Sequence, residues 1–212
     1  MNKLKSKIKR NSEIDYNQEF EITQLHADKG FIDYQKGKFK ELMPNASETE
    51  IEKQVTNLIA RNNSVDLIID GIYKYFDIVI DDDDVKAFAE RIKNNVLNDK
   101  EGNISNSTMK EMVSNDKVLQ NIAVSTLKRN LLFNELATLW DIRITDTDVK
   151  QSLDSYYQKT NMPIRDILND KNKFESVRQI MLNERIGIEL LRRFKVNFNF
   201  PKEPDGKKNN NQ

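Results

Sequence analysis

Three places in the sequence carry residue types that bind metals or phosphate or act in catalysis. His26 is the only histidine and there is no cysteine, so His26 has no partner residue for a zinc site or a catalytic triad. The run Asp81–Asp84 offers carboxylates for calcium. However, Lys86 stands where an EF-hand loop needs glycine, and Ile92 stands where it needs glutamate. We therefore expect no metal site in either place.

The third place is Gly30–Lys38, which has a faint likeness to a phosphate-binding loop. Six residues separate Gly30 from Gly37 where the motif has four, and Phe39 follows the lysine in place of Ser or Thr. No spacing elsewhere favours a nucleophile with its base or a pair of catalytic carboxylates. The sequence thus predicts a protein without enzymatic activity and without a cofactor.

Helix capping explains the acidic residues better than catalysis or metal binding does. The segment Asp77–Lys86 recurs as Asp141–Lys150, and in each copy an apolar helix ends and a new helix begins. Each copy has an N-cap residue, an acidic residue three positions on as in a capping box, and an apolar pair placed as a hydrophobic staple. These are Thr145 with Asp148 and Ile144 with Val149 in the second copy, and Asp81 with Asp84 and Ile80 with Val85 in the first.

Composition indicates an all-α protein. The chain of 212 residues has only 6 Gly and 4 Pro, and its formal net charge is zero although 32% of the residues are charged. High polarity combined with long helices suggests an elongated body with much surface per residue. The chain has no apolar run near the roughly 20 residues of a membrane span, and its N-terminus lacks the features of a secretory signal. We expect a cytoplasmic protein that binds no membrane and no specific nucleic acid.

Apolar residues at three- and four-residue steps predict the helices. Gly71 lies inside the second of them, costs it about 1 kcal/mol relative to Ala, and is expected to admit a neighbouring helix. Alternation of Phe20 and Ile22 with polar residues indicates a short extended segment. The predicted helices cover residues 30–43, 48–76 (with Ser47 and Glu50 as capping box), 81–97, 108–140 (with a break at Asn115-Asp116), 146–160, 164–168 and 173–194, with a loop at 98–107.

We divide the chain into three parts. Residues 1–18 are a flexible basic arm, which is either simply solvated or in contact with RNA or a ribosome surface. Residues 19–200 form one helical domain built from two related units, about 30–97 and 108–198. Residues 201–212 are a polar tail that we expect to be disordered.

The second copy of the repeat and the chain after it resemble the C-terminal domain of trigger factor, an ATP-independent folding chaperone. The likeness lies in LLFNELATLWDI, in the cap RITDTDV, in YYQKTNMPIRDIL and in the last helix FESVRQIMLNERIGIELLRRFKV. Residues 31–92 resemble the earlier part of the same domain. The chain is also similar to the helical core of the chaperone SurA. The resemblance implies an elongated helical body with arms whose inner face holds unfolded or nascent polypeptides.

Trigger factor docks on the ribosome through a Gly-Phe-Arg-x-Gly-Lys loop, and this chain departs from that motif. Gly30-Phe31 is followed by Ile32-Asp33, so ribosome docking is not carried over from the family. The chain is also too short for the family's prolyl isomerase domain. The resemblance therefore implies a stand-alone chaperone module.

Methionine suits a promiscuous apolar surface because its side chain is flexible and polarizable. The candidate client-binding residues are Met43, Met109, Met112, Met162 and Met181. The alternative is that most of them are ordinary core residues. The sequence predicts a holdase that works without ATP. The alternative is a helical adaptor that binds one defined protein partner or the ribosome, for which the lysine-rich N-terminus is the favourable sign.

Overall fold

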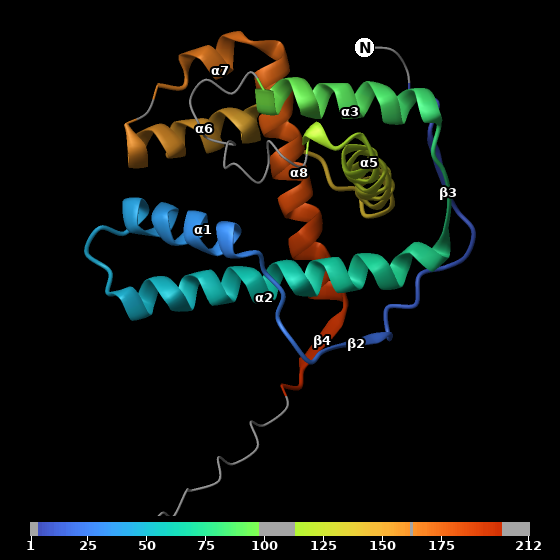
Figure 1. Ribbon diagram of the computed structural model, residues 1–212, viewed down its shortest axis with the longest axis horizontal. Coiled ribbons are helices and arrows are strands. Elements are labelled where there is room, and N and C mark those ends of the chain that lie inside the picture. The colour runs from blue at the N-terminus through green and yellow to red at the C-terminus, as the bar shows by residue number, and fades with distance from the viewer. Residues whose placement is uncertain (1–3, 98–112, 162, 201–212) are drawn as a thin grey trace, which may run out of the picture. The chain divides into compact units, whose positions relative to one another are not determined.

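The computed structural model describes residues 4–97, 113–161 and 163–200, and most of these residues lie in helices (Figure 1). The fold is mainly helical, as predicted, but it is not all-α, because short strands also form. The helices are α1 (Lys29–Leu42), α2 (Glu48–Ile72), α3 (Asp82–Leu97), α5 (Asp116–Leu139), α6 (Asp146–Thr160), α7 (Arg165–Asn169) and α8 (Lys171–Arg193), with a 3-10 turn at Tyr73–Tyr75. The described residues also contain the short strands β1 (Lys7–Arg10), β2 (Glu19–Ile22), β3 (Phe76–Val79) and β4 (Lys195–Phe198).

Strand β1 lies within residues 1–18, for which we predicted a flexible arm. It pairs antiparallel with β3, and Ile8 lies opposite Ile78. Ile8 is half-buried, whereas the cationic residues beside it are exposed. The prediction of a flexible arm is therefore wrong for this strand. One half-buried isoleucine among lysines is too weak a period-2 pattern to indicate a strand.

The start of α3 differs from the predicted capping box. Asp81 caps the helix as expected, because its Oδ1 accepts hydrogen bonds from the N–H groups of Asp83 and Asp84 at 3.0 and 3.4 Å. The Asp84 carboxylate instead accepts from the N–H groups of Lys5 and Ser6, at 2.9 and 2.6 Å. Hydrogen bonds from Ser6 hold the pKa of Asp84 below its ordinary value. Asp84 thereby anchors the chain segment that precedes β1.

The other two predicted caps are confirmed. At α6, Thr145 and Asp148 form a capping box, in which the Thr145 N–H donates to the Asp148 carboxylate at 2.7 Å. At α2, the Ser47 N–H donates to the Glu50 carboxylate at 2.7 Å, and the Glu50 N–H donates back to the Ser47 hydroxyl at 3.3 Å. These local signals set where helices begin.

The sequence repeat produces two different links between helices. In the first copy, α2 ends at Ile72 and the chain passes through the 3-10 turn into β3. In the second copy, α5 ends at Leu139, and Asp141 adopts a positive φ of 49° in the link to α6. The N-cap residue therefore repeats, whereas the capping box forms at α6 and not at α3. In addition, strand β1 pairs with the link of the first copy.

Two compact units make up the fold, and each is assembled from separate stretches of the chain. The first unit comprises residues 1–14 and 72–190, and the second comprises residues 15–71 and 191–212. We predicted consecutive units at 30–97 and 108–198, so the structural division differs from the predicted one. Pairing of β1 with β3 and of β2 with β4 joins distant stretches, and local periodicity does not indicate such pairing.

The described residues of the first unit include two apolar clusters. Helices α3 and α5 enclose one of them, in which Ala123 is fully buried and Leu127 is 2% exposed. Helices α6, α7 and α8 enclose the other around Val149, which is fully buried. Ile144 lies in the same cluster as Val149, as the predicted staple requires, and Ile80 packs against the cluster that contains Val85.

The second unit joins β2 and β4 in a parallel pair. The Phe20 ring of β2 is 7% exposed and meets the Phe194 ring edge to face, with 5.8 Å between centroids. The same ring lies against Gly71 of α2, where an added Cβ would come within 2.2 Å of it. The predicted extended segment at residues 20–22 is therefore β2. Gly71 admits an aromatic ring of that strand, where we had expected a helix.

Some predictions fall on residues that the structure does not describe. They include the loop at 98–107 and the tail at 201–212. None of the helices in the described part of the chain combines the length and the apolar character that a membrane crossing needs.

Candidate functional site

The α1–α2 hairpin of the second unit forms the candidate site. Asp28 caps α1 by accepting a hydrogen bond from the Phe31 N–H at 3.2 Å. At the other end of α1 the Met43 N–H donates to the Phe39 carbonyl at 2.8 Å. Pro44 cannot continue the helix because it has no N–H to donate. The chain therefore turns over residues 43–46 and enters α2 at the Ser47 cap.

The apolar residues of the hairpin are unequally buried. On α2, Ile51, Val55 and Ile59 are buried, with Ile51 3% exposed. The α1 side chains that pack against them, such as Phe39, remain partly exposed, and so does Met43 after the helix. The hairpin thus has a well-packed α2 side and an incompletely covered α1 side.

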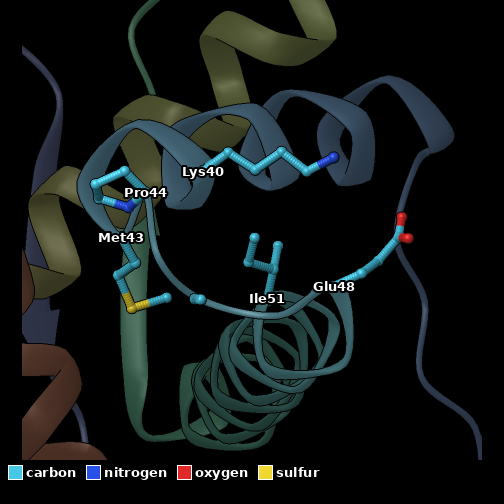
Figure 2. Close-up of a pocket in the computed structure, with 6 residues that line it drawn as sticks. Lys40, Met43, Pro44, Glu48 and Ile51 are labelled. Carbon is cyan, nitrogen blue, oxygen red and sulfur yellow. The ribbon is translucent and has the colours of Figure 1, made fainter.

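A pocket opens at the turn between the two helices (Figure 2). It has a volume of about 260 Å³. Its lining combines apolar groups with one cation and one anion, from Lys40, Met43, Pro44, Ala46, Glu48 and Ile51. In Figure 2, Met43 and Pro44 lie on one side of Ile51, and the ammonium of Lys40 and the carboxylate of Glu48 lie on the other.

Charged residues face each other across the hairpin at two levels. Farther from the turn, the Lys36 ammonium pairs with the Glu52 carboxylate at 2.9 Å. This hydrogen bond lowers the pKa of Glu52 and raises the pKa of Lys36. One helical turn closer to the pocket, Lys40 and Glu48 hold the corresponding positions. Among the described residues Lys40 makes no ion pair or hydrogen bond, so this second level is open.

A second apolar region lies in α6, α7 and α8 of the first unit. Arg178 of α8 closes one side of it, because its Nη1 donates to the Ile144 carbonyl at 2.6 Å and its Nη2 binds Asp146. The hydrogen bond to Asp146, and after it the one that Arg178 donates to the Glu175 carboxylate, raises the pKa of Arg178. Large apolar side chains nevertheless stay exposed on these helices, namely Tyr156, Tyr157, Leu168, Ile180 and Ile188.

The structure places two of the five predicted methionines. Met43 is half-buried and lines the pocket of the α1–α2 hairpin. Met181 is half-buried against the α6–α8 cluster, in the first unit. Met109, Met112 and Met162 lie outside the described residues. The two described methionines therefore belong to different units, and the client-binding role of all five stays a prediction.

Sequence reasoning missed the polar half of the pocket. Lys36 and Lys40 are one helical turn apart on α1, and Glu48 and Glu52 are one turn apart on α2. In an antiparallel hairpin this spacing brings Lys36 opposite Glu52 and Lys40 opposite Glu48. The spacing of these four residues therefore predicts two ion pairs. It does not show that Lys40 and Glu48 remain unpaired.

His26 and the acidic run have structural contacts. The His26 N–H donates to the Asn63 side chain at 2.7 Å, and the His26 carbonyl accepts from it at 2.9 Å. Within residues 4–97, 113–161 and 163–200, no group of three or more His, Asp or Glu side chains is placed to hold a metal ion.

Comparison with known proteins finds relatives in Mycoplasma. No protein-family model matches the chain. The chain is 32% identical over 196 residues to the uncharacterized MG377 homolog of Mycoplasma pneumoniae. The matched region covers 92% of this chain and 94% of the relative. The chain is 29% identical over 196 residues to uncharacterized protein MG377 of Mycoplasma genitalium, with the same coverage.

A solved structure is similar along nearly the whole chain. The crystal structure of the hypothetical Mycoplasma protein MPN555 superimposes with a TM-score of 0.74 at 30% identity, and it covers 96% of each chain. Identity and coverage at this level indicate common descent. The chain therefore belongs to the family that contains uncharacterized protein MG377 and its Mycoplasma pneumoniae homolog.

Proposed function

We propose that this protein is an ATP-independent holdase that binds unfolded or nascent polypeptides in the cytoplasm and catalyses no reaction. Its fold then belongs with the helical body and arms of the trigger factor C-terminal domain and of SurA. The α1–α2 hairpin is one such arm. Clients bind along its incompletely covered apolar side and at its turn.

The open apolar end of the α1–α2 hairpin is the observation that supports this function. Leu42 is 62% exposed at the end of α1, and the neighbouring Met43 lines a pocket above the buried Ile51. Apolar residues gathered in one place on a soluble protein mark a surface that binds something. A flexible methionine at its edge suits ligands of varied shape.

The size of this surface fits weak and reversible binding. A pocket of about 260 Å³ lies below the range of about 300–1,000 Å³ that is typical of small-molecule sites. A holdase gains affinity by engaging one client at several weak sites. The exposed side chains of α6–α8, such as Tyr156, Tyr157 and Ile180, supply further apolar contacts.

Suppression of aggregation tests the proposal. A chemically denatured model enzyme is diluted into buffer with an equimolar amount of the protein and no ATP, and light scattering is followed. We expect lower scattering with several unrelated clients. Leu42→Ser should weaken the effect. Val79→Ser should not, although Val79 of β3 is 65% exposed and Leu42 is 62% exposed. Unchanged scattering with every client would rule the holdase out.

A pull-down from cell extract separates the holdase from an adaptor. A diffuse set of unfolded chains fits the holdase, whereas one folded partner in stoichiometric amount contradicts it. The observation that favours the adaptor is the exposed cationic side of β1, with Lys7 and Lys9. If that strand contacts a ribosome, co-sedimentation should weaken with added salt and with Lys7→Ala and Lys9→Ala.

A further inference from the structure

Lys40 and Glu48 line the pocket with opposite charges that form no ion pair with each other. Lys36 and Glu52 neutralise each other at 2.9 Å, whereas Lys40 and Glu48 line the pocket. Among the residues that the structure describes, Lys40 has no hydrogen-bonding partner. The charge of Glu48 helps to raise the pKa of Lys36, but Glu48 forms no hydrogen bond with it. The pocket therefore presents a free hydrogen-bond donor and a free acceptor next to its apolar floor.

This pair of charges selects against charged ligands. A carboxylate that approaches Lys40 also approaches Glu48, and an ammonium that approaches Glu48 also approaches Lys40, so attraction and repulsion offset each other. A peptide group suits both charges, because its carbonyl accepts from an ammonium and its N–H donates to a carboxylate. Charge-assisted hydrogen bonds of this kind are stronger than those between neutral groups.

The pocket has an apolar side and a charged side, which suit the side chain and the backbone of one residue in an extended polypeptide. Met43 and Pro44 lie on the apolar side of Ile51, where a side chain can enter, and the charges lie on the other side, where the backbone would pass (Figure 2). We propose that the pocket binds an uncharged apolar side chain from the interior of an extended polypeptide. Lys40 donates to a backbone carbonyl of that polypeptide, and Glu48 accepts from a backbone N–H.

This assignment rests on the proposed function and narrows it. It states that the hairpin recognises internal apolar residues, and that it disfavours chain termini and charged side chains. Unfolded polypeptides offer internal apolar residues in quantity, whereas folded proteins bury them. The hairpin would therefore distinguish unfolded chains from folded ones through backbone access as well as through apolar character.

Methyl NMR on the full chain reads the pocket directly. The protein has 6 methionines, so ¹³C-methyl-methionine labelling gives a short spectrum in which Met43→Leu assigns the Met43 signal. The probe is an N-acetylated, C-amidated peptide of Gly and Ser with one central Leu. Matched peptides carry Asp or Lys at the centre, or a Leu at a free C-terminus. We expect the blocked Leu peptide to shift the Met43 signal at the lowest concentration.

Variants show whether the peptide binds in the pocket or to apolar surface in general. Lys40→Ala and Glu48→Ala should each weaken binding of the blocked Leu peptide about 10- to 150-fold, as loss of one charge-assisted hydrogen bond implies. Lys53→Ala is the matched control, because Lys53 is an exposed lysine of α2 outside the pocket lining. Ala46→Phe should fill the pocket and abolish the peptide-induced shift of the Met43 signal. This change adds apolar surface, so a general apolar effect would not explain the loss.

Each outcome has a definite meaning. A Met43 signal that stays in place while the wild-type protein suppresses aggregation overturns the pocket assignment and leaves the holdase standing. Tighter binding of the free C-terminal Leu, lost with Lys40→Ala and kept with Glu48→Ala, also overturns it in favour of a carboxylate site. A wild-type protein that suppresses no aggregation overturns the proposed function, and with it the assignment of this pocket to clients.

Discussion

Gly71→Ala tests the packing of the second unit most sharply. A Cβ at Gly71 would lie 2.2 Å from Cε1 of Phe20 and 2.8 Å from its Cζ. The ring is 7% exposed and is held against Phe194, so it cannot move without losing contacts. Overpacking costs about 1–3 kcal/mol, and disruption of the aromatic pair costs about 0.5–1.5 kcal/mol more. Ala in place of Gly within a helix returns about 1 kcal/mol.

The net expectation is a loss of about 1–3 kcal/mol in the free energy of unfolding, and a fall in Tm of roughly 2–12 °C for a chain of this size. Urea and thermal unfolding followed by circular dichroism measure both quantities. Gly37→Ala is the matched control. Gly37 lies inside α1, and an added Cβ would have no atom within 4 Å apart from its chain neighbours and the backbone of its own helix. This change should therefore stabilise by about 0.5–1 kcal/mol.

A second mutation shows whether the Phe20 ring is the cause. Phe20→Leu in the Gly71→Ala background should cost less than the sum of the two single changes, because the smaller side chain leaves room for the new methyl group. The reasoning is refuted if Gly71→Ala is as stable as the wild type, or if the two changes are strictly additive.

Two further predictions concern the polar contacts of the first unit. The pKa of Asp84 is lowered in the folded protein by hydrogen bonds from Ser6, so its contribution to stability is present above the pKa of the unfolded chain, about 3.9. That contribution is lost as the pH falls through the folded value, and Asp84→Asn should flatten this acid dependence of the urea midpoint. An unchanged slope would contradict it. Arg178→Ala should cost about 1–3 kcal/mol, because the Ile144 carbonyl and Asp146 lose their donor. Arg178→Lys should recover little, since one ammonium cannot replace the planar fork, and full recovery would contradict the assignment.

The helices and their starting points could be predicted because their signals are local. The periodicity of apolar residues located the described helices to within a few residues, apart from the end of α2 and the break before α5. The cap residues Thr145 and Ser47 marked the starts of α6 and α2. Asn115 caps α5 at the predicted break, with its side chain accepting from the Val118 N–H. Each of these features depends on residues within one turn of the helix.

The pairing of the strands and the division into two units depend on contacts between distant residues, although a local alternation did indicate the segment that forms β2. β1 pairs with a strand about 70 residues later, and β2 pairs with one about 175 residues later. Asp84 shows the same limit. Its spacing from Asp81 indicated a capping box, but its carboxylate accepts from the N–H groups of Lys5 and Ser6, which lie almost 80 residues earlier in the chain.

The candidate site was predicted in part. Met43 was named for its chemistry and its place near a turn, and it lines the pocket. The open level at Lys40 and Glu48 depends on side-chain conformations that spacing does not fix. Packing between helices decides which apolar residues, such as Tyr156, stay exposed. The periodicity of the sequence does not predict this.

Hydrogen exchange in the presence of a client tests most directly whether the α1–α2 hairpin holds unfolded chains. The full-length protein is mixed with a permanently unfolded polypeptide or with the native form of the same polypeptide, and amide exchange is compared over residues 39–51. We predict slower exchange there with the unfolded form and no change with the native form. Equal exchange in both mixtures, or protection by the native form alone, would contradict the proposed function of this hairpin.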